Sequence, residues 1–134
     1  MVKLNKIIHT SGKRKRAIAR ATLKPGTGLV KINRKKLNVY NPKMARLKLK
    51  EPLILAGNIA NEVNININVK GGGVISQTEA ARLAMSRALV KYNKKLEKIF
   101  LSYDRHLLIA DVRRKETCKP NTSKARAKRQ KSYR

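Results

Sequence analysis

The stretch Glu62–Leu89, EVNININVKGGGVISQTEAARLAMSRAL, predicts a strand, a glycine turn and a helix in direct succession. Its first part alternates apolar and polar residues with the period of two that is typical of a half-buried strand. The apolar face consists of Val63, Ile65, Ile67 and Val69, and the polar face of Asn64, Asn66, Asn68 and Lys70. We expect the apolar face to pack in the core and the asparagine face to meet solvent or a polar partner, because amides both donate and accept hydrogen bonds.

The second part of this stretch predicts a long helix after the turn Gly71–Gly73. Ser76 and Glu79 form an S-x-x-E capping box, which predicts that the helix starts at Ser76. An apolar stripe at helical spacing predicts the side that faces the core. The stripe consists of Ala81, Ala84, Met85, Ala88, Leu89 and Tyr92, with Arg82, Ser86 and Lys91 outside it.

The residues before this stretch predict further strands. Ala17–Leu23 places alanine and leucine on one face, with the period of a strand that has close-packed neighbours. Ser11–Arg16 is predicted to be a polar basic turn, and Ile7–Ile8 could enter a strand before it. Lys24–Gly28 has the proline and glycines of a turn, and we expect Leu29–Asn33 to pair back as the second arm of a hairpin.

Between these strands and the central stretch, the sequence predicts a helix. Asn41 is expected to be its N-cap, with Pro42 at the first helical position. Pro52 restricts the residue before it, so the helix should stop or break by Glu51. Pro52–Gly57 is then expected to form a second short helical turn that closes at Gly57.

A third helix is predicted over Lys94–Tyr103, and Leu107–Ala110 is predicted to be a short apolar strand or staple. The inward residues of the third helix are expected to be Leu96, Ile99, Phe100 and Tyr103. Strands followed by helices, with one more strand between them, predict an α+β fold in which helices pack on one face of a small sheet. We expect a globular domain over residues 1–111 and an extended basic C-terminal tail over residues 112–134.

The charge of the chain indicates a polyanionic partner. It has 34 Lys and Arg against 7 Asp and Glu, which gives a formal net charge of +27. Self-repulsion of this size weakens a compact state unless a polyanion neutralises it. The few carboxylates can serve at helix ends and in local ion pairs, which leaves few for catalysis.

The segment Thr117–Arg134 contains seven Lys or Arg and no Asp or Glu. It lacks the apolar residues of a core, so it should not fold on its own. Fully extended, it could reach roughly 60 Å, which is long enough to thread into folded RNA. A merely solubilising tail is the alternative interpretation.

Several classes of function are disfavoured by simple absences in the sequence. Cys118 is alone, so an internal disulfide or a cysteine-rich zinc site is excluded. His9 and His106 have no metal-binding motif around them, and we expect no metal or other cofactor. No apolar run is long enough for a membrane span or, within Met1–Gly12, for a signal peptide. We therefore expect a nucleic-acid partner, no membrane and a cytoplasmic location.

The glycine turn before a helix admits three interpretations. It could cradle a nucleotide phosphate as in a small phosphotransferase, contact an RNA phosphate, or be a plain turn. A P-loop requires G-x-x-x-x-G-K-[ST], which the residues after Gly73 do not match. Aromatic residues make up only 4% of the chain, too few to stack on single-stranded bases, so phosphate contacts with structured RNA are favoured. A histone-like DNA compactor is a second alternative.

The segment GGGVISQTEAARLAMSRAL (Gly71–Leu89) closely resembles the signature of the universal small-subunit ribosomal protein S-nine family. The shared features are the three glycines, Ser76-Gln77, small residues at Ala80 and Ala84, and the ending Arg87-Ala88-Leu89. Ser11–Asn33 and Leu107–Glu116 are also similar to that family. The ending KRQKSYR (Lys128–Arg134) resembles archaeal and eukaryotic members more than bacterial ones.

The resemblance implies a non-enzymatic protein in the head of the small ribosomal subunit, with the fold of the second domain of ribosomal protein S-five. Its implied partners are small-subunit ribosomal RNA, peptidyl-site transfer RNA and neighbouring head proteins. The tail would bring Arg134 to the anticodon stem-loop of that transfer RNA, supported by Arg129, Lys131 and Tyr133, the last in the place of a bacterial lysine. The residues expected to bind ribosomal RNA are Lys13, Arg14, Lys15, Arg16, Arg20, Lys70, Gly71, Gly72, Gly73, Gln77, Arg113, Arg114, Lys115, Lys119, Lys124, Arg126 and Lys128.

Overall fold

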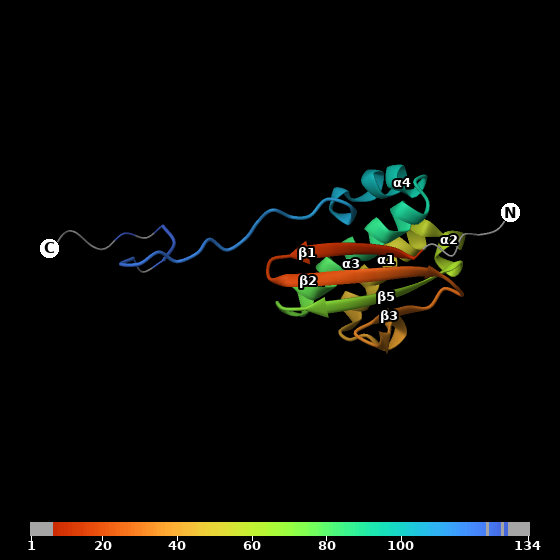
Figure 1. Ribbon diagram of the computed structural model, residues 1–134, viewed down its shortest axis with the longest axis horizontal. Helices are drawn as coiled ribbons and strands as arrows, with labels where there is room; N and C mark the ends of the chain where they lie inside the picture. The colour runs from red at the N-terminus through yellow and green to blue at the C-terminus, as the bar shows by residue number, and fades with distance from the viewer. Residues whose placement is uncertain (1–6, 123, 127, 129–134) are drawn as a thin grey trace.

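A computed structural model describes residues 7–122, 124–126 and 128, and it confirms the α+β class (Figure 1). The strands are β1 (Ile8–Arg14), β2 (Ala17–Pro25), β3 (Val30–Ile32), β4 (Lys35–Lys36) and β5 (Val63–Lys70). The helices are α1 (Lys43–Ala56), α2 (Asn58–Asn61), α3 (Val74–Tyr92) and α4 (Leu96–Tyr103), with 3-10 turns η1 (Leu37–Val39) and η2 (Arg105–Leu107). Within the described part of the chain, no helix is long and apolar enough to cross a membrane.

The five strands form one sheet in the order β1-β2-β5-β3-β4. β2 pairs antiparallel with both β1 and β5, β3 lies parallel to β5, and β4 pairs antiparallel with β3. The prediction that Ser11–Arg16 is a turn was wrong for most of its length. Ser11–Arg14 continue β1, with Ser11 opposite Arg20, and only Lys15 and Arg16 make the turn. Lys15 has φ +52, as a tight hairpin requires.

The prediction that Leu29–Asn33 pairs back on Ala17–Leu23 was also wrong, because β5 lies between these two segments. Side-chain amides fix the position of this segment against β5. The Asn64 Oδ1 accepts hydrogen bonds from the backbone N–H groups of Thr27 and Leu29, both at 2.9 Å. The Asn33 side chain bonds the N–H and the carbonyl of Val69 at 2.8 and 3.2 Å. These contacts to β5 are non-local, so a local hairpin pattern could not show them.

Helix α1 begins and ends differently from the prediction. Pro42 is the N-cap and Lys43 the first helical residue, instead of Asn41 and Pro42. The helix does not break at Glu51 but continues through Pro52 to Ala56, and it ends at Gly57 with φ +57, as predicted for that end. Proline in a helix interior removes one backbone hydrogen bond. Pro52 is buried in the same helix as Leu49 and Ala56, so tertiary packing outweighs the local restriction.

Helix α3 starts two residues before the predicted capping box. Gly73 is the N-cap, no side chain caps the helix, and Ser76 lies inside its first turn. The predicted stripe is buried from Ala81 to Leu89, with Tyr92 half-buried. Ser86, predicted to lie outside the stripe, is also buried, and its hydroxyl donates to the carbonyl of Arg82 at 2.8 Å. This local hydrogen bond satisfies the hydroxyl, so its burial carries little penalty.

The third predicted helix exists as α4 but buries only half of its expected inward side. Leu96 and Phe100 are buried, whereas Ile99 and Tyr103 are 44% and 56% exposed. Two buried positions one helical turn apart are enough to seat a helix of this length on the domain. Leu107, predicted in a strand or staple, is buried at the end of η2, and Leu107–Ala110 contains no strand.

The core lies between the sheet and α3. Its central feature is that the backbones of the strands and of α3 pack closely against each other. Alanines line both sides, with Ala17, Ala19 and Ala21 on β2 and Ala80, Ala81, Ala84 and Ala88 on α3 all buried. At Gly12 on β1 the approach is closer still. A Cβ built there would lie 2.3 Å from the Ala80 carbonyl oxygen and 2.7 Å from the Ala84 nitrogen. No side chain larger than hydrogen fits at this position without movement of β1 or α3.

Replacing Gly12 with alanine should therefore destabilise the domain by about 1–3 kcal/mol or more, because the added methyl group overpacks a backbone contact. The measurement is denaturant unfolding in enough salt to screen the net positive charge. Gly73→Ala is the control for an added methyl group, because a Cβ at Gly73 meets no atom within 4 Å; as the N-cap of α3, it should cost no more than about 1 kcal/mol. Equal stability of the Gly12 and Gly73 variants would contradict the role given to Gly12.

Candidate nucleic-acid interface

A cleft of about 810 Å³ opens where three segments that are distant in sequence meet. They are the β1–β2 turn, the glycine loop before α3, and the start of the C-terminal segment. The lining residues are Lys15, Arg16, Gly72, Gly73, Ser76, Arg113, Arg114, Lys115, Glu116, Thr117 and Cys118. Five side chains of this lining are cationic and one is a carboxylate, so the cleft favours an anion.

The glycine loop gives the cleft a wall of exposed backbone. Gly71 and Gly72 have φ +76 and +67, a region that favours glycine. The Gln77 side chain donates to the Gly71 carbonyl at 3.1 Å and braces the loop from the first turns of α3. A Cβ at Gly72 would lie 3.1 Å from Ala17, so the loop packs tightly against the start of β2.

The first turn of α3 adds backbone donors at this wall. The N–H of Gln77 bonds to the Gly73 carbonyl at 2.9 Å, which is the first hydrogen bond of the helix. The N–H groups of Val74, Ile75 and Ser76 therefore have no carbonyl partner within the helix. Val74 and Ile75 are 50% and 69% exposed. Free N–H groups at the positive end of a helix dipole, beside lysines and arginines, are suited to a phosphate.

The C-terminal segment is held to the hairpin turn at its start. Arg114 donates from Nη1 to the Lys15 carbonyl at 3.1 Å. Asp111 accepts from the backbone N–H and the guanidinium of Arg113, with the closest contact at 2.7 Å. The bonds from the Arg113 side chain and backbone hold the pKa of Asp111 well below its usual range. Beyond this anchor the described residues extend away from the domain (Figure 1).

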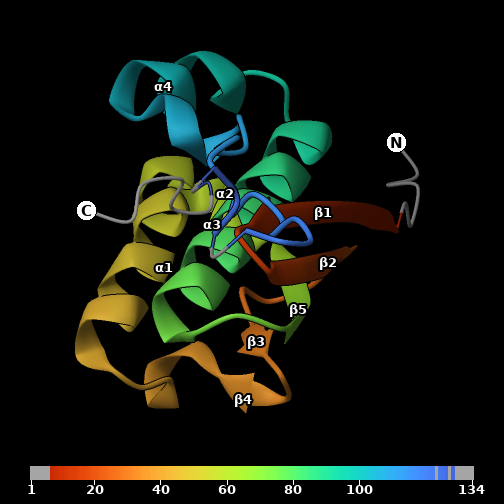
Figure 2. The ribbon, with the colours of Figure 1, turned by 90° about the vertical axis from the view of Figure 1, so that its left-hand side faces the viewer.

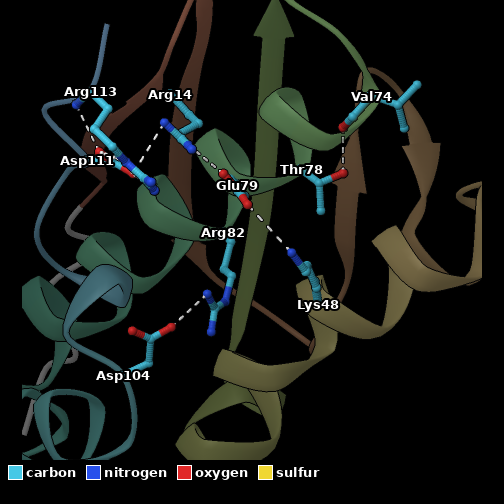
Figure 3. Close-up of polar contacts among 9 residues, drawn as sticks. All are labelled: Arg14, Lys48, Val74, Thr78, Glu79, Arg82, Asp104, Asp111 and Arg113. Carbon is cyan, nitrogen blue, oxygen red and sulfur yellow. Dashed lines mark hydrogen bonds and ion pairs between the residues drawn. The ribbon is translucent and has the colours of Figure 1, made fainter.

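Outside the cleft lining, an ion-pair network joins β1, α1 and α3 (Figure 3). Glu79 accepts from Arg14 Nε at 2.7 Å and lies 3.5 Å from Lys48 Nζ. Arg14 also reaches Asp111 at 3.3 Å, and its side chain is only 15% exposed. Arg14 is thus committed to carboxylates of its own chain, and its contact with RNA stays a prediction.

Arg82 makes a second pair of contacts from the same face of α3. Its guanidinium lies 2.5 Å from Glu51 Oε2 on α1 and 3.0 Å from Asp104 Oδ2, just after α4. These ion pairs link α3 to α1 and to the residue that follows α4. Sequence reasoning placed Arg82 outside the core stripe and missed its role, because its partners lie far away along the chain.

The network perturbs the titration of its carboxylates. Burial raises the pKa of Glu79, but the hydrogen bond and charge of Arg14, with those of Lys48, bring it below its ordinary value of 4.5. Burial also raises the pKa of Asp104, but the hydrogen bonds from the His106 backbone and from Arg82 bring this pKa below its ordinary value. Both carboxylates therefore keep their charge to a lower pH in the folded protein than in the unfolded chain.

The other predicted contacts are distributed over two further places. Lys13, Arg20 and Lys70 are exposed on strands, and all three lie outside the cleft. On the C-terminal segment, Glu116 accepts from Lys119 at 3.1 Å and from Arg126 at 2.9 Å. Lys124 and Lys128 are exposed. Arg129, Lys131, Tyr133 and Arg134 lie outside the described residues.

The chemistry available at this site is binding. Over the described ranges, no three His, Cys, Asp or Glu side chains gather where they could hold a metal ion. Five carboxylates, Glu51, Glu79, Asp104, Asp111 and Glu116, are in ion pairs with lysine or arginine. Ser76 and Thr117 also line the cleft, a position that neither the capping-box interpretation nor the tail's composition predicted.

Glu79→Gln should lower the free energy of unfolding at pH 7 by about 1–2 kcal/mol, less than for a fully buried pair because Glu79 is 30% exposed. Since the folded pKa is lowered, the unfolded chain takes up this proton first as pH falls. The stabilisation is present above the unfolded pKa, near 4.5, and is lost as pH falls through the folded value. Denaturant unfolding across this range should show a shallower loss of stability for the variant than for the wild type.

The control for this pH profile is Glu62→Gln, which makes the same change at an exposed carboxylate that is in no ion pair with a described residue. Its stability should follow that of the wild type at each pH. A Glu79→Gln variant with the wild-type acid profile would mean that the Arg14–Glu79–Lys48 contacts do not stabilise the fold.

Comparison with known proteins gives a consistent result over nearly the whole chain. The family model described as "Ribosomal protein S9/S16" matches residues 12–134. The "Small ribosomal subunit protein uS9" of Methanococcus maripaludis (strain C5) is 51% identical over 133 residues, covering 96% of this chain and 99% of that protein. The protein of the same name from Methanococcus vannielii is 50% identical with the same coverage. Both relatives are archaeal, which fits the resemblance of the ending to archaeal and eukaryotic members. This chain belongs to the ribosomal protein S9/S16 family.

Proposed function

We propose that this protein is a component of the small ribosomal subunit and binds ribosomal RNA through its phosphates. The observation that carries the proposal is the cationic cleft, in which Lys15, Arg16 and Arg113–Lys115 surround the glycine loop and the first turn of α3. Charged side chains and free backbone N–H groups recognise phosphate without reading base sequence. The names of the archaeal relatives, which place those proteins in the small subunit, support the assignment.

Membership of a ribosomal protein family removes the enzymatic alternative. The chain is not a phosphotransferase, although it shares a glycine loop before a helix with such enzymes. A glycine loop does not imply catalysis, because function depends on the groups placed at it. Here those groups are cations and backbone donors. The family also makes a histone-like DNA compactor the weaker alternative.

For the C-terminal segment, we propose a separate role beyond the globular domain. Residues 112–134 form the tail, which orders on RNA and carries its last residues to the anticodon stem-loop of peptidyl-site transfer RNA. The contacts fall to Arg129, Lys131, Tyr133 and Arg134, and the support is the resemblance of the ending to archaeal and eukaryotic family members. Neighbouring proteins of the subunit head complete the surroundings, and the location is the cytoplasmic ribosome.

If 6–10 phosphates are contacted, affinity for purified small-subunit ribosomal RNA should fall by roughly 10³–10⁵ between 50 and 200 mM salt. Arg16→Ala combined with Lys115→Ala should weaken binding and reduce the slope of log affinity against log salt by about 0.7–0.9 for each phosphate that is no longer neutralised. Lys95→Ala combined with Lys98→Ala removes the same charge near α4 and should leave the slope unchanged. Equal slopes for the two double variants would show that net charge, not the cleft, governs binding.

Deleting Lys128–Arg134 should leave cooperative unfolding and incorporation into small subunits nearly intact, because the buried core of the described residues ends at Leu107. Occupancy of the peptidyl site by transfer RNA, measured by filter binding on purified subunits, should fall. A full-length tail with Lys128, Arg129, Lys131 and Arg134 changed to serine separates charge from length and should behave like the deletion. Failure of the deleted protein to enter subunits would mean that this segment anchors the protein.

A further inference from the structure

The face of the sheet opposite the helices is uncovered. Seen end on, α1, α3 and α4 all lie on one side of the strands (Figure 2). The outward residues of β2 and β5 alternate with the buried ones, and most of them are exposed. This uncovered side, here called the open face, is distinct from the cleft at the N-terminus of α3.

The charge of the open face has one sign. Its cations are Lys13 on β1, Arg20 and Lys24 on β2, Lys31 on β3, Lys36 on β4 and Lys70 on β5. None of the five strands contains an Asp or Glu. No ion pair joins any of these cations to a carboxylate within the described ranges, in contrast to Arg14 and Arg82 on the helical side. The open face is therefore complementary to a polyanion.

Two asparagine side chains lie among these cations, and their amides are available to a binding partner. Asn64 and Asn33 are used within the fold, whereas Asn66 and Asn68 are exposed and make no hydrogen bond to a described residue through their side chains. Strand pairing places Asn68 beside Arg20, and Asn66 between Thr22 and Lys31. Lys31, Arg34, Asn66 and Asn68 also line a shallow depression of about 330 Å³. Amide donors and acceptors thus alternate with cations across neighbouring strands.

This pattern favours a double-helical RNA over a single strand. The open face has no Tyr, Phe or Trp on its strands, so it offers no platform on which bases could stack. A base-paired RNA presents phosphates and 2′-hydroxyl groups across its shallow minor groove. Cations match the phosphates, and an amide can both donate to and accept from a 2′-hydroxyl.

We propose that the open face is a second RNA-binding surface, which takes a double-helical segment of RNA through Arg20, Lys31, Asn66, Asn68 and Lys70. This inference rests on the proposed function, since the RNA is that of the small subunit. It adds a ligand class and a surface that the cleft and the tail do not include. The protein would then bind RNA at two separate surfaces, the cleft and the open face.

The test is amine footprinting of the full chain bound to purified small-subunit ribosomal RNA, with no other protein present. An acetylating reagent modifies exposed lysines, and mass spectrometry gives the rate at each site. Lys24, Lys31 and Lys70 should be modified on the order of tenfold more slowly in the complex than in the free protein. Lys95 and Lys98, exposed beside and on α4, serve as internal controls and should keep their free rates.

The same spectra separate failure of this inference from failure of the proposed function. Lys15, Lys115, Lys119 and Lys124 report the cleft and the tail. If these are protected while Lys24, Lys31 and Lys70 react freely, RNA binds but the open face is not a binding surface. If none is protected, the proposed function fails as well. Equal protection of Lys95 and Lys98 would indicate nonspecific coating and would also overturn the inference.

Asn66→Asp combined with Asn68→Asp provides the matched variant, because it places two carboxylates on the open face with almost no change in shape. Protection of Lys31 and Lys70 should disappear while that of Lys15 and Lys115 remains. Asn58→Asp with Asn61→Asp makes the same change on α2 and should have no effect. A double-stranded RNA of roughly 16 base pairs, a length suited to minor-groove recognition, should protect Lys31 more than its single strand does. Equal protection by the two would overturn the double-helical assignment.

Discussion

The structure depends on the close contact between the sheet and α3. Alanines on β2 face alanines on α3, and at Gly12 the strand backbone approaches the helix too closely for any Cβ. Only small residues permit this spacing, and close packing of this kind resists even a single added methyl group. The contact holds the N-terminus of α3 beside the β1–β2 turn. It thereby places the glycine loop, Lys15 and Arg16 of the turn, and the start of the C-terminal segment around one cleft.

Charge is distributed unevenly over this frame. Carboxylates meet arginine and lysine on the helical side, where Glu79 and Arg82 join α3 to its neighbours. The cleft and the strands carry cations with few or no carboxylates beside them. With a formal net charge of +27, the domain repels itself most strongly at these surfaces. An RNA partner that neutralises them would stabilise the fold at the same time as it is bound.

Predictions from the sequence were correct where a structural feature depends on neighbouring residues, and wrong where it depends on contacts between distant residues. The alternation over Val63–Lys70 and the stripe over Ala81–Leu89 were predicted correctly, since periodicity directly records which side of an element is buried. The pairing of Leu29–Asn33 was predicted wrongly because a local hairpin and a parallel crossover share the same strand pattern. The capping box failed at Glu79, whose carboxylate binds Arg14 and Lys48 instead of the helix end. Pro52 was predicted to end a helix that tertiary packing continues.

The sequence by itself determined the α+β class, the large excess of positive charge and, through the Gly71–Leu89 motif, the family. Composition and periodicity are properties of neighbouring residues, so they can be read without a structure. Only the tertiary structure decided that Lys15, Gly72 and Arg114 share a cleft, that Arg14 is paired, and that Asn66 and Asn68 remain available while Asn64 does not. These outcomes depend on contacts between residues far apart along the chain, and the geometry of such contacts exists only once the sheet and α3 have packed.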